Sequence, residues 1–225
     1  MDVSTGEADC ICGKHFAPSI ETTSLMPWQT SVPDLWRYIN AQKLLRYNLP
    51  PSALVPEAEI QRASQQINAY LEGLKLGKDL PSYELQHSDD LAILAAQAFV
   101  NTWKQTGDDS HLYNAVALLE YAISRSKMSY QVRLHLIRIY RLLGAPSLAL
   151  EHYRSINLKQ VQNDTLSHFM LSRASTFSLS SMGDLTYTTE CMESSRIYLS
   201  NSEEVGRNCS CSTQVMNHLY SRPPN

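Results

Sequence analysis

The sequence lacks an apolar run as long as the roughly 20 residues that a membrane-spanning helix needs. Its first residues also lack the basic lead and apolar core of a signal peptide, because Asp2, Glu7 and Asp9 stand there instead. Excess positive charge is missing too, since 19 Lys and Arg face 22 Asp and Glu, a net charge of −3. We therefore expect a soluble, cytoplasmic protein with no membrane contact and no direct nucleic-acid binding, although local basic patches remain compatible with this composition.

Cysteine is scarce, and the odd count of five favours reduced thiols over a disulfide framework. Thiols and imidazoles near the two ends of the chain leave open a zinc site that joins the ends: Cys10, Cys12, His15, Cys209, Cys211 and His218. Only one residue separates the cysteines of each pair, which is closer than structural zinc sites usually place them. Free thiols are favoured, and we predict no metal.

Catalytic motifs are absent, including a Gly-rich phosphate loop, HExxH and Gly-x-Ser-x-Gly. Arg141-Leu-Leu-Gly144-Ala-Pro146 partly imitates the acetyl-CoA pyrophosphate loop of acetyltransferases, but the Arg lies in a helical pattern and Pro146 removes a needed donor. The pairs Asp89-Asp90 and Asp108-Asp109 open predicted helices, where they complement the helix dipole. His135 and His168 are predicted to be surface or boundary residues. We predict no catalytic or cofactor-binding residue, and an enzyme using Cys or His is the least favoured alternative.

Three glycines, Gly107, Gly144 and Gly183, each separate two amphipathic helical patterns, at spacings of 37 and 39 residues. A glycine at such a corner supplies the positive φ that helix ends often need. A repeat of this length is typical of tetratricopeptide-like solenoids, in which stacked helix pairs bury apolar faces that one pair cannot bury alone. We predict an all-α fold of antiparallel helix pairs stacked as a tetratricopeptide-like right-handed solenoid.

The composition divides the chain into four parts. They are an irregular or disordered stretch over 1–30, a helical segment over 31–80, tetratricopeptide-like helical repeats over 88–200, and an irregular tail over 201–225. In the second part, one helix is predicted from about Pro33, with a capping-box-like start at Ser31 and Asp34, and another from Pro56 to about Gly77. Residues 78–87 read as a linker.

The repeat region begins at Ser88, a predicted N-cap, with a helix that is apolar on nearly every side and therefore expected to be sandwiched between neighbours. Its partner, after Gly107, has a one-sided apolar stripe. Residues 132–136 alternate as a strand would, but Val132, Leu136 and Ile139 share one helical face, which favours a helix. Pro146 suits the first turn of the next helix.

A third unit is predicted after these two. Asp164 is its predicted cap, and its first helix carries Leu166, Phe169, Met170, Ala174 and Phe177. After Gly183, a partner helix carries Tyr187, Cys191, Met192 and Ile197.

Charge is unevenly distributed in the repeats. Residues 129–160 carry a balance of +4 and residues 182–205 one of −4. Arg133, Arg138 and Arg141 lie opposite the apolar face of their helix and are the candidate partner-contact surface. An ordinary solvated face is the alternative for any one of them. A generic helical-repeat adaptor that captures peptides with this stripe is the alternative function.

Residues 85–200 resemble the non-catalytic, auxiliary subunit of the NatB amino-terminal acetyltransferase complex. The resemblance is carried by blocks in the family's order: Ser88-Asp-Asp-Leu-Ala-Ile-Leu-Ala-Ala, Thr102-Trp-Lys-Gln-Thr-Gly-Asp108, Ala117-Leu-Leu-Glu-Tyr121, Arg133-Leu-His-Leu-Ile-Arg-Ile-Tyr-Arg-Leu-Leu-Gly-Ala145 and Val161-Gln-Asn-Asp-Thr165. It covers about half of the chain, and family members are several times longer.

The resemblance implies an α-helical superhelix that wraps a separate catalytic acetyltransferase subunit and helps to position it at the ribosome. It also implies support for cotranslational acetylation of nascent chains beginning Met-Asp, Met-Glu, Met-Asn or Met-Gln. The chain itself would bind no acetyl-CoA and no other cofactor. No catalytic residue carries over, because the matching positions are repeat-packing residues.

Overall fold

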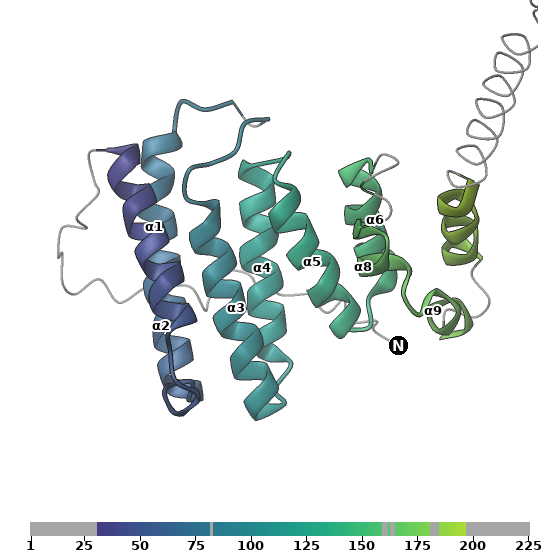
Figure 1. Ribbon diagram of the computed structural model, residues 1–225, viewed down its shortest axis with the longest axis horizontal. Coiled ribbons are helices and arrows are strands. Elements are labelled where there is room, and N and C mark those ends of the chain that lie inside the picture. Colours follow the sequence, from purple (N-terminus) through teal and green to yellow (C-terminus); the bar gives the residue numbers. More distant parts are fainter. Residues whose placement is uncertain (1–30, 82, 159–161, 163–164, 181–184, 197–225) are drawn as a thin grey trace, which may run out of the picture.

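The computed structural model describes residues 31–81, 83–158, 162, 165–180 and 185–196 (Figure 1). Every regular element in these ranges is helical, which confirms the all-α prediction. In chain order the elements are α1 (Val32–Tyr47), η2 (Pro51–Ala53), α2 (Pro56–Gly73), η3 (Leu74–Gly77), α3 (Asp89–Thr106), α4 (Ser110–Arg125), α5 (Tyr130–Leu142), α6 (Pro146–Ile156), α8 (His168–Leu171) and α9 (Ala174–Ser180). Residues 186–196 form a further helix.

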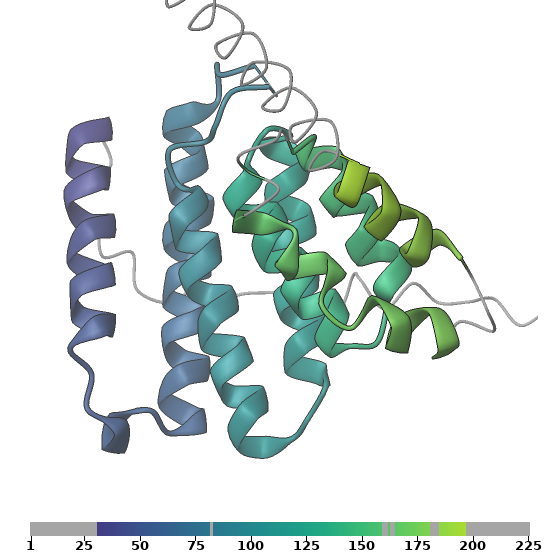
Figure 2. The ribbon, with the colours of Figure 1, turned by 45° about the vertical axis from the view of Figure 1, so that its right-hand side comes forward.

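Helices that follow one another in the chain pack side by side from α2 to α6 (Figure 1). The predicted pairs α3 with α4 and α5 with α6 are both formed, and α8 packs against α5 and α6. The most extensive contact joins α2 to α3, so the helical segment over 31–80 lies directly against the first predicted repeat. Figure 2 shows α1 at the edge of the series, where Leu35 and Ile39 are its buried residues.

Helix α3 is the centre of the hydrophobic core, as its all-round apolar sequence predicted. It lies between α2 and α4 and buries Leu91, Phe99 and all of its alanines. Alanine side chains let the neighbouring backbones approach closely, so a helix of this composition is stable only when it is covered on several sides. Ser88 and Ser31 stand at the predicted N-cap positions of α3 and α1, but neither hydroxyl makes a capping hydrogen bond, so the predicted caps are wrong in that detail.

Two of the three glycines take the predicted corner conformation. Gly107 has φ of +72° and Gly144 has φ of +70°, in the left-handed region that favours glycine. Gly107 donates its N–H to the Trp103 carbonyl at 2.7 Å, and Ala145 donates to the Tyr140 carbonyl at 2.8 Å, which closes the ends of α3 and α5. Pro146 occupies the first turn of α6, as expected. Gly183 lies outside the described residues.

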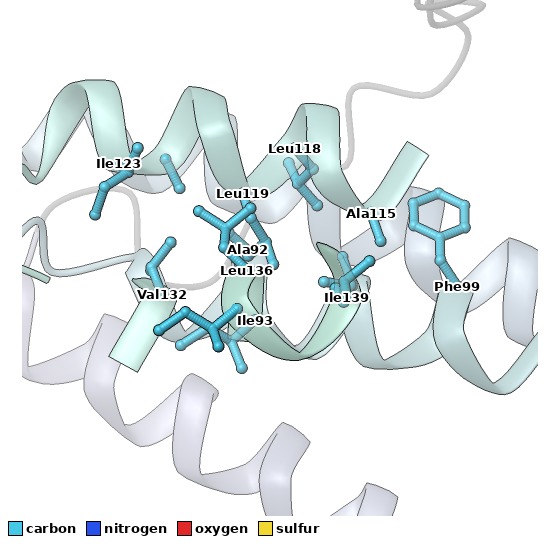
Figure 3. Packing of buried hydrophobic residues seen from close by; sticks show 14 of the residues in the cluster. Ala92, Ile93, Phe99, Ala115, Leu118, Leu119, Ile123, Val132, Leu136 and Ile139 are labelled. Atoms are coloured by element: carbon cyan, nitrogen blue, oxygen red, sulfur yellow. The ribbon is translucent and has the colours of Figure 1, made fainter. Parts of the chain in front are cut away.

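The ambiguous stretch over 132–136 is helical, within α5. Its apolar face is part of the core, since Val132 and Leu136 are completely buried and Ile139 nearly so. In Figure 3, Leu136 lies beside Leu119 of α4, and Ile139 lies near Ala115 and Leu118 of the same helix. The strand-like alternation is thus overruled by helical packing against α4 and α6.

The prediction of one continuous first helix for the third unit is wrong. Instead, α8 ends at Leu171, Ser172 is extended, Arg173 has φ of +64° and α9 begins at Ala174. The break exposes backbone carbonyls that Arg141 then binds, so a tertiary contact replaces part of the helical hydrogen bonding.

The partner helix of this unit is present over 186–196, with Tyr187 buried and Cys191 half-buried, as predicted. Met192, predicted for the same apolar stripe, is 65% exposed. Asp164 and Ile197 lie outside the described residues.

Candidate partner-binding groove

A groove of about 550 Å³ lies between α3, α5 and the segment around α9. α1 contributes one side chain to its wall. The lining residues are Arg46, Ala96, Gln97, Val100, Asn101, Trp103, Lys104, His135, Arg138, Ile139, Arg141, Leu142, Arg173 and Phe177. Its walls thus come from elements far apart in the sequence, which the packing of successive helices brings together.

The groove is strongly basic. None of its lining residues is Asp or Glu, whereas five are Lys or Arg. His135 also lines it, but burial lowers the pKa of this imidazole, so it is neutral at pH 7 and adds no charge. Its Nδ1 lies 2.9 Å from the Gln131 carbonyl and its Nε2 lies 3.4 Å from Gln97. His135 is therefore a boundary residue, as predicted.

Two of the three predicted contact arginines line this groove. Arg138 is exposed, and its guanidinium lies 5.8 Å from the centre of the Phe169 ring. Arg141 is half-buried and donates to the carbonyls of Phe169 and Ser172, the latter at 2.6 Å. Arg141 therefore anchors the α8–α9 segment as well as facing the groove.

The third arginine, Arg133, does not line the groove. It donates to the Lys127 carbonyl at 2.6 Å and lies 3.5 Å from His152 of α6. His152 in turn lies 2.8 Å from Glu120, which also accepts a 2.7 Å bond from the Tyr140 hydroxyl. These bonds hold the pKa of the Glu120 carboxyl below its usual range. The cluster links α4, α5 and α6.

Sequence reasoning missed Arg46, Lys104 and Arg173 as groove residues. One usable signal was present on α3, where Gln97, Asn101 and Lys104 follow at helical spacing on an otherwise apolar helix. A polar stripe on a buried helix indicates a face that meets solvent or a partner. No comparable signal marked Arg46 and Arg173, because their positions depend on how separate elements pack.

The rejected acetyl-CoA loop is a helix-to-helix turn in the structure. Arg141 lies within α5, Gly144 is a helix corner, and Pro146 opens α6 without an N–H. Successive N–H groups that could bind a pyrophosphate are not offered there. The prediction of a turn at Gly144 is confirmed.

Three carboxylates of the two acidic pairs make structural contacts within the chain. Asp90 forms a 2.8 Å ion pair with Lys43, Asp108 accepts a 2.9 Å bond from the Ser110 N–H, and Asp109 accepts one from the Trp103 indole.

No group of His, Cys, Asp and Glu among the described residues could hold a metal ion. Cys10, Cys12, Cys209 and Cys211 lie outside those residues. In the same ranges, no helix is both long and apolar enough to cross a membrane.

Asp89 is a buried carboxyl group in the first turn of α3, one of the helices that form the groove. It is 8% exposed, and burial raises the pKa of its carboxyl to about 6, although the hydroxyls of Ser126 and Ser129 partly oppose this rise. Because the folded state holds this proton more tightly than the unfolded state, folding stability falls as the pH rises from about 4 to about 6. A tenfold change in proton affinity corresponds to about 1.4 kcal/mol.

We therefore expect Asp89→Asn to be more stable than the parent by about 2–3 kcal/mol at pH 7, with this advantage vanishing near pH 4. Urea unfolding at several pH values measures it. Asp79→Asn, on the exposed loop before α3, controls for the loss of one negative charge. If the difference in unfolding free energy between the parent and Asp89→Asn is the same at pH 4 and pH 7, the raised pKa of Asp89 is contradicted.

Comparison with known proteins decides the family. Residues 14–212 match the family described as the N-acetyltransferase B complex (NatB) non catalytic subunit. The chain belongs to this family. The match extends beyond the 85–200 stretch that carries the sequence resemblance, and it includes every helix described above.

Similar curated proteins are also named as subunits of NatB. The chain is 37% identical over 101 residues to the human protein named N-alpha-acetyltransferase 25, NatB auxiliary subunit, covering 45% of this chain and 10% of that protein. It is 34% identical over 144 residues to the Schizosaccharomyces pombe N-terminal acetyltransferase B complex subunit arm1, covering 60% of this chain and 17% of that protein. An Arabidopsis thaliana NatB auxiliary subunit is 29% identical over 118 residues, 52% of this chain and 11% of that protein.

Membership in the NatB family supports two of the sequence-based predictions. The family is described as a non catalytic subunit, and the relatives are named auxiliary subunits, which agrees with the predicted auxiliary, non-catalytic role. The chain spans between 10% and 17% of the length of these three relatives.

Proposed function

We propose that this chain holds a separate catalytic acetyltransferase subunit and supports cotranslational acetylation of nascent chains in the cytoplasm, near the ribosome. The observation that carries the proposal is the match of residues 14–212 to the family of NatB non-catalytic subunits. In this role the chain supplies binding surface and requires no cofactor of its own. The acetyl transfer itself is carried out by the catalytic subunit.

The proposed architecture is a tetratricopeptide-like right-handed solenoid. It is supported by the series of neighbouring helix contacts from α2 to α6 and by a groove whose walls come from α3, α5 and α9, with α4 and α6 contributing no lining residue. Stacked helix pairs produce an extended concave surface of this kind, which suits the capture of a partner chain.

The proposed contact surface includes Arg133, Arg138 and Arg141. Arg138 is the most direct candidate, because it is exposed and lines the groove, whereas internal hydrogen bonds engage the other two. Charge complementarity at such a surface speeds association and selects the partner.

Co-expression with the catalytic subunit of NatB tests the proposal. The affinity-tagged chain should recover the catalytic subunit at low salt, and an unrelated helical-repeat protein of similar size should not. Failure to recover any acetyltransferase subunit under these conditions would remove the proposed role.

A further inference from the structure

We infer that the basic groove binds a carboxylate-rich segment of polypeptide and takes an apolar side chain of that segment on its floor. The inference rests on the proposed function only in placing this segment on a partner chain. It assigns a ligand chemistry to the groove, which neither the family description nor the names of the relatives does.

Some of the positively charged side chains in the groove have no negatively charged partner among the described residues. Arg46 is paired with the buried Glu59, and Arg141 is held by the carbonyls of Phe169 and Ser172. Lys104, Arg138 and Arg173 are exposed and form no ion pair with a carboxylate among the described residues. Three positive groups that share one hollow repel one another, so an anionic ligand relieves an unfavourable interaction as well as forming new ones.

The groove is also apolar where it is not charged. Val100, Trp103 and Phe177 are half-buried along it, and Leu142 is 49% exposed. A volume of about 550 Å³ accommodates a few side chains, not a folded domain. Carboxylates that bind the three cations, with an aliphatic side chain against the floor, would fill a hollow with this distribution of charge.

Single-stranded nucleic acid fits the groove less well, although it is also anionic. Such ligands gain affinity by stacking bases on exposed aromatic faces. The Phe177 ring already carries the Arg141 guanidinium at 5.3 Å, and the Phe169 ring beside the groove carries Arg138 at 5.8 Å. The Trp103 indole is fixed by a 2.9 Å bond to Asp109. Each of the two phenylalanine rings thus has one face covered by an arginine of the chain, and the Trp103 indole is held in place by its N–H bond, which favours carboxylates over stacked nucleotides.

Fluorescence anisotropy with the full chain tests the inference. The probe is a fluorescein-labelled peptide containing three Glu-Leu-Glu-Ser repeats, compared with the same peptide carrying Gln in place of Glu and with a uridine dodecamer. We expect binding of the Glu peptide that weakens with salt, and at least about tenfold weaker binding of the Gln peptide. Equal binding of both peptides, no binding of the Glu peptide, or tighter binding of the RNA would overturn the inference.

Matched variants locate the site. Lys104→Glu combined with Arg138→Glu should weaken the Glu peptide at least about tenfold, and Lys104→Gln with Arg138→Gln should give a smaller loss in the same direction. The control is Lys78→Glu with Lys127→Glu, two exposed lysines outside the groove with the same change in net charge, for which we expect less than about a twofold effect. Equal losses in the groove and control variants would place binding elsewhere.

The peptide-binding experiment and the recovery of the catalytic subunit test the groove inference and the proposed function separately. A chain that recovers the catalytic subunit but fails to bind the Glu peptide refutes the groove inference alone. A chain that binds the peptide through Lys104 and Arg138 but recovers no acetyltransferase subunit refutes the proposed function alone.

Discussion

Glu59→Ala should destabilise the protein by about 3–5 kcal/mol, the usual cost of removing one partner from a buried charge network. The Glu59 side chain has no solvent exposure, and its carboxylate accepts bonds from Arg46 at 2.8 Å and from Arg62, with Asn101 at 3.5 Å. These partners come from α1, α2 and α3, so one carboxylate links three helices. Its loss leaves two guanidinium groups, 18% and 27% exposed, without their counter-ion.

Urea unfolding measures this effect, with Glu57→Ala as the matched control. Glu57 is exposed and stands in the same first turn of α2, so both variants lose the same favourable interaction with the helix dipole. Replacing Arg46 and Arg62 by Met in the Glu59→Ala background should recover part of the stability, because the uncompensated charges are then gone. If Glu59→Ala costs no more than Glu57→Ala, the network does not hold these helices together.

Leu136→Ala should cost about 2–5 kcal/mol, as is usual for a large-to-small change in a core. Leu136 is completely buried on α5 and lies between α4 residues and Ile93 of α3 in the close view (Figure 3). The loss combines the transfer free energy of the removed atoms with the cavity left behind, since neighbouring helices relax only in part.

Leu142→Ala on the same helix is the control for Leu136→Ala. Its side chain is 49% exposed, so we expect a cost below about 1 kcal/mol in the same urea titration. Similar costs for the two variants would show that α5 is not packed as described.

The helical layout could be predicted because it is encoded locally. Gly107 and Gly144 mark corners through their own backbone preference, and Pro146 marks a helix start for the same reason. The apolar stripe of α5 distinguished helix from strand once the window reached Ile139. These signals depend on a residue and its near neighbours, so no knowledge of the fold is needed.

The features that could not be predicted depend on contacts between distant residues. At the break near Ser172, the freed carbonyl accepts a hydrogen bond from Arg141, 31 residues earlier in the chain. Glu59 looks like an exposed helical glutamate until Arg46 and Asn101 are brought against it. Hydrophobic periodicity reports which face is buried, but it does not report which polar groups meet there.

The candidate groove could be predicted only in part. Arg138 and Arg141 were identified from the charge of one helix face, and both line the groove. Arg133, on the same helix, contacts α6 and the preceding loop instead, because five residues along a helix turn a side chain well away from the starting face. Arg46 and Arg173 join the groove only through tertiary packing.

The most direct test of the central claim is the mass of the particle formed when the purified chain is mixed with the catalytic subunit of NatB. Size-exclusion chromatography with light scattering should show one species whose mass is that of a complex of the two proteins. Two separate peaks, each with the mass of a protein alone, would contradict the claim that this chain holds the catalytic subunit.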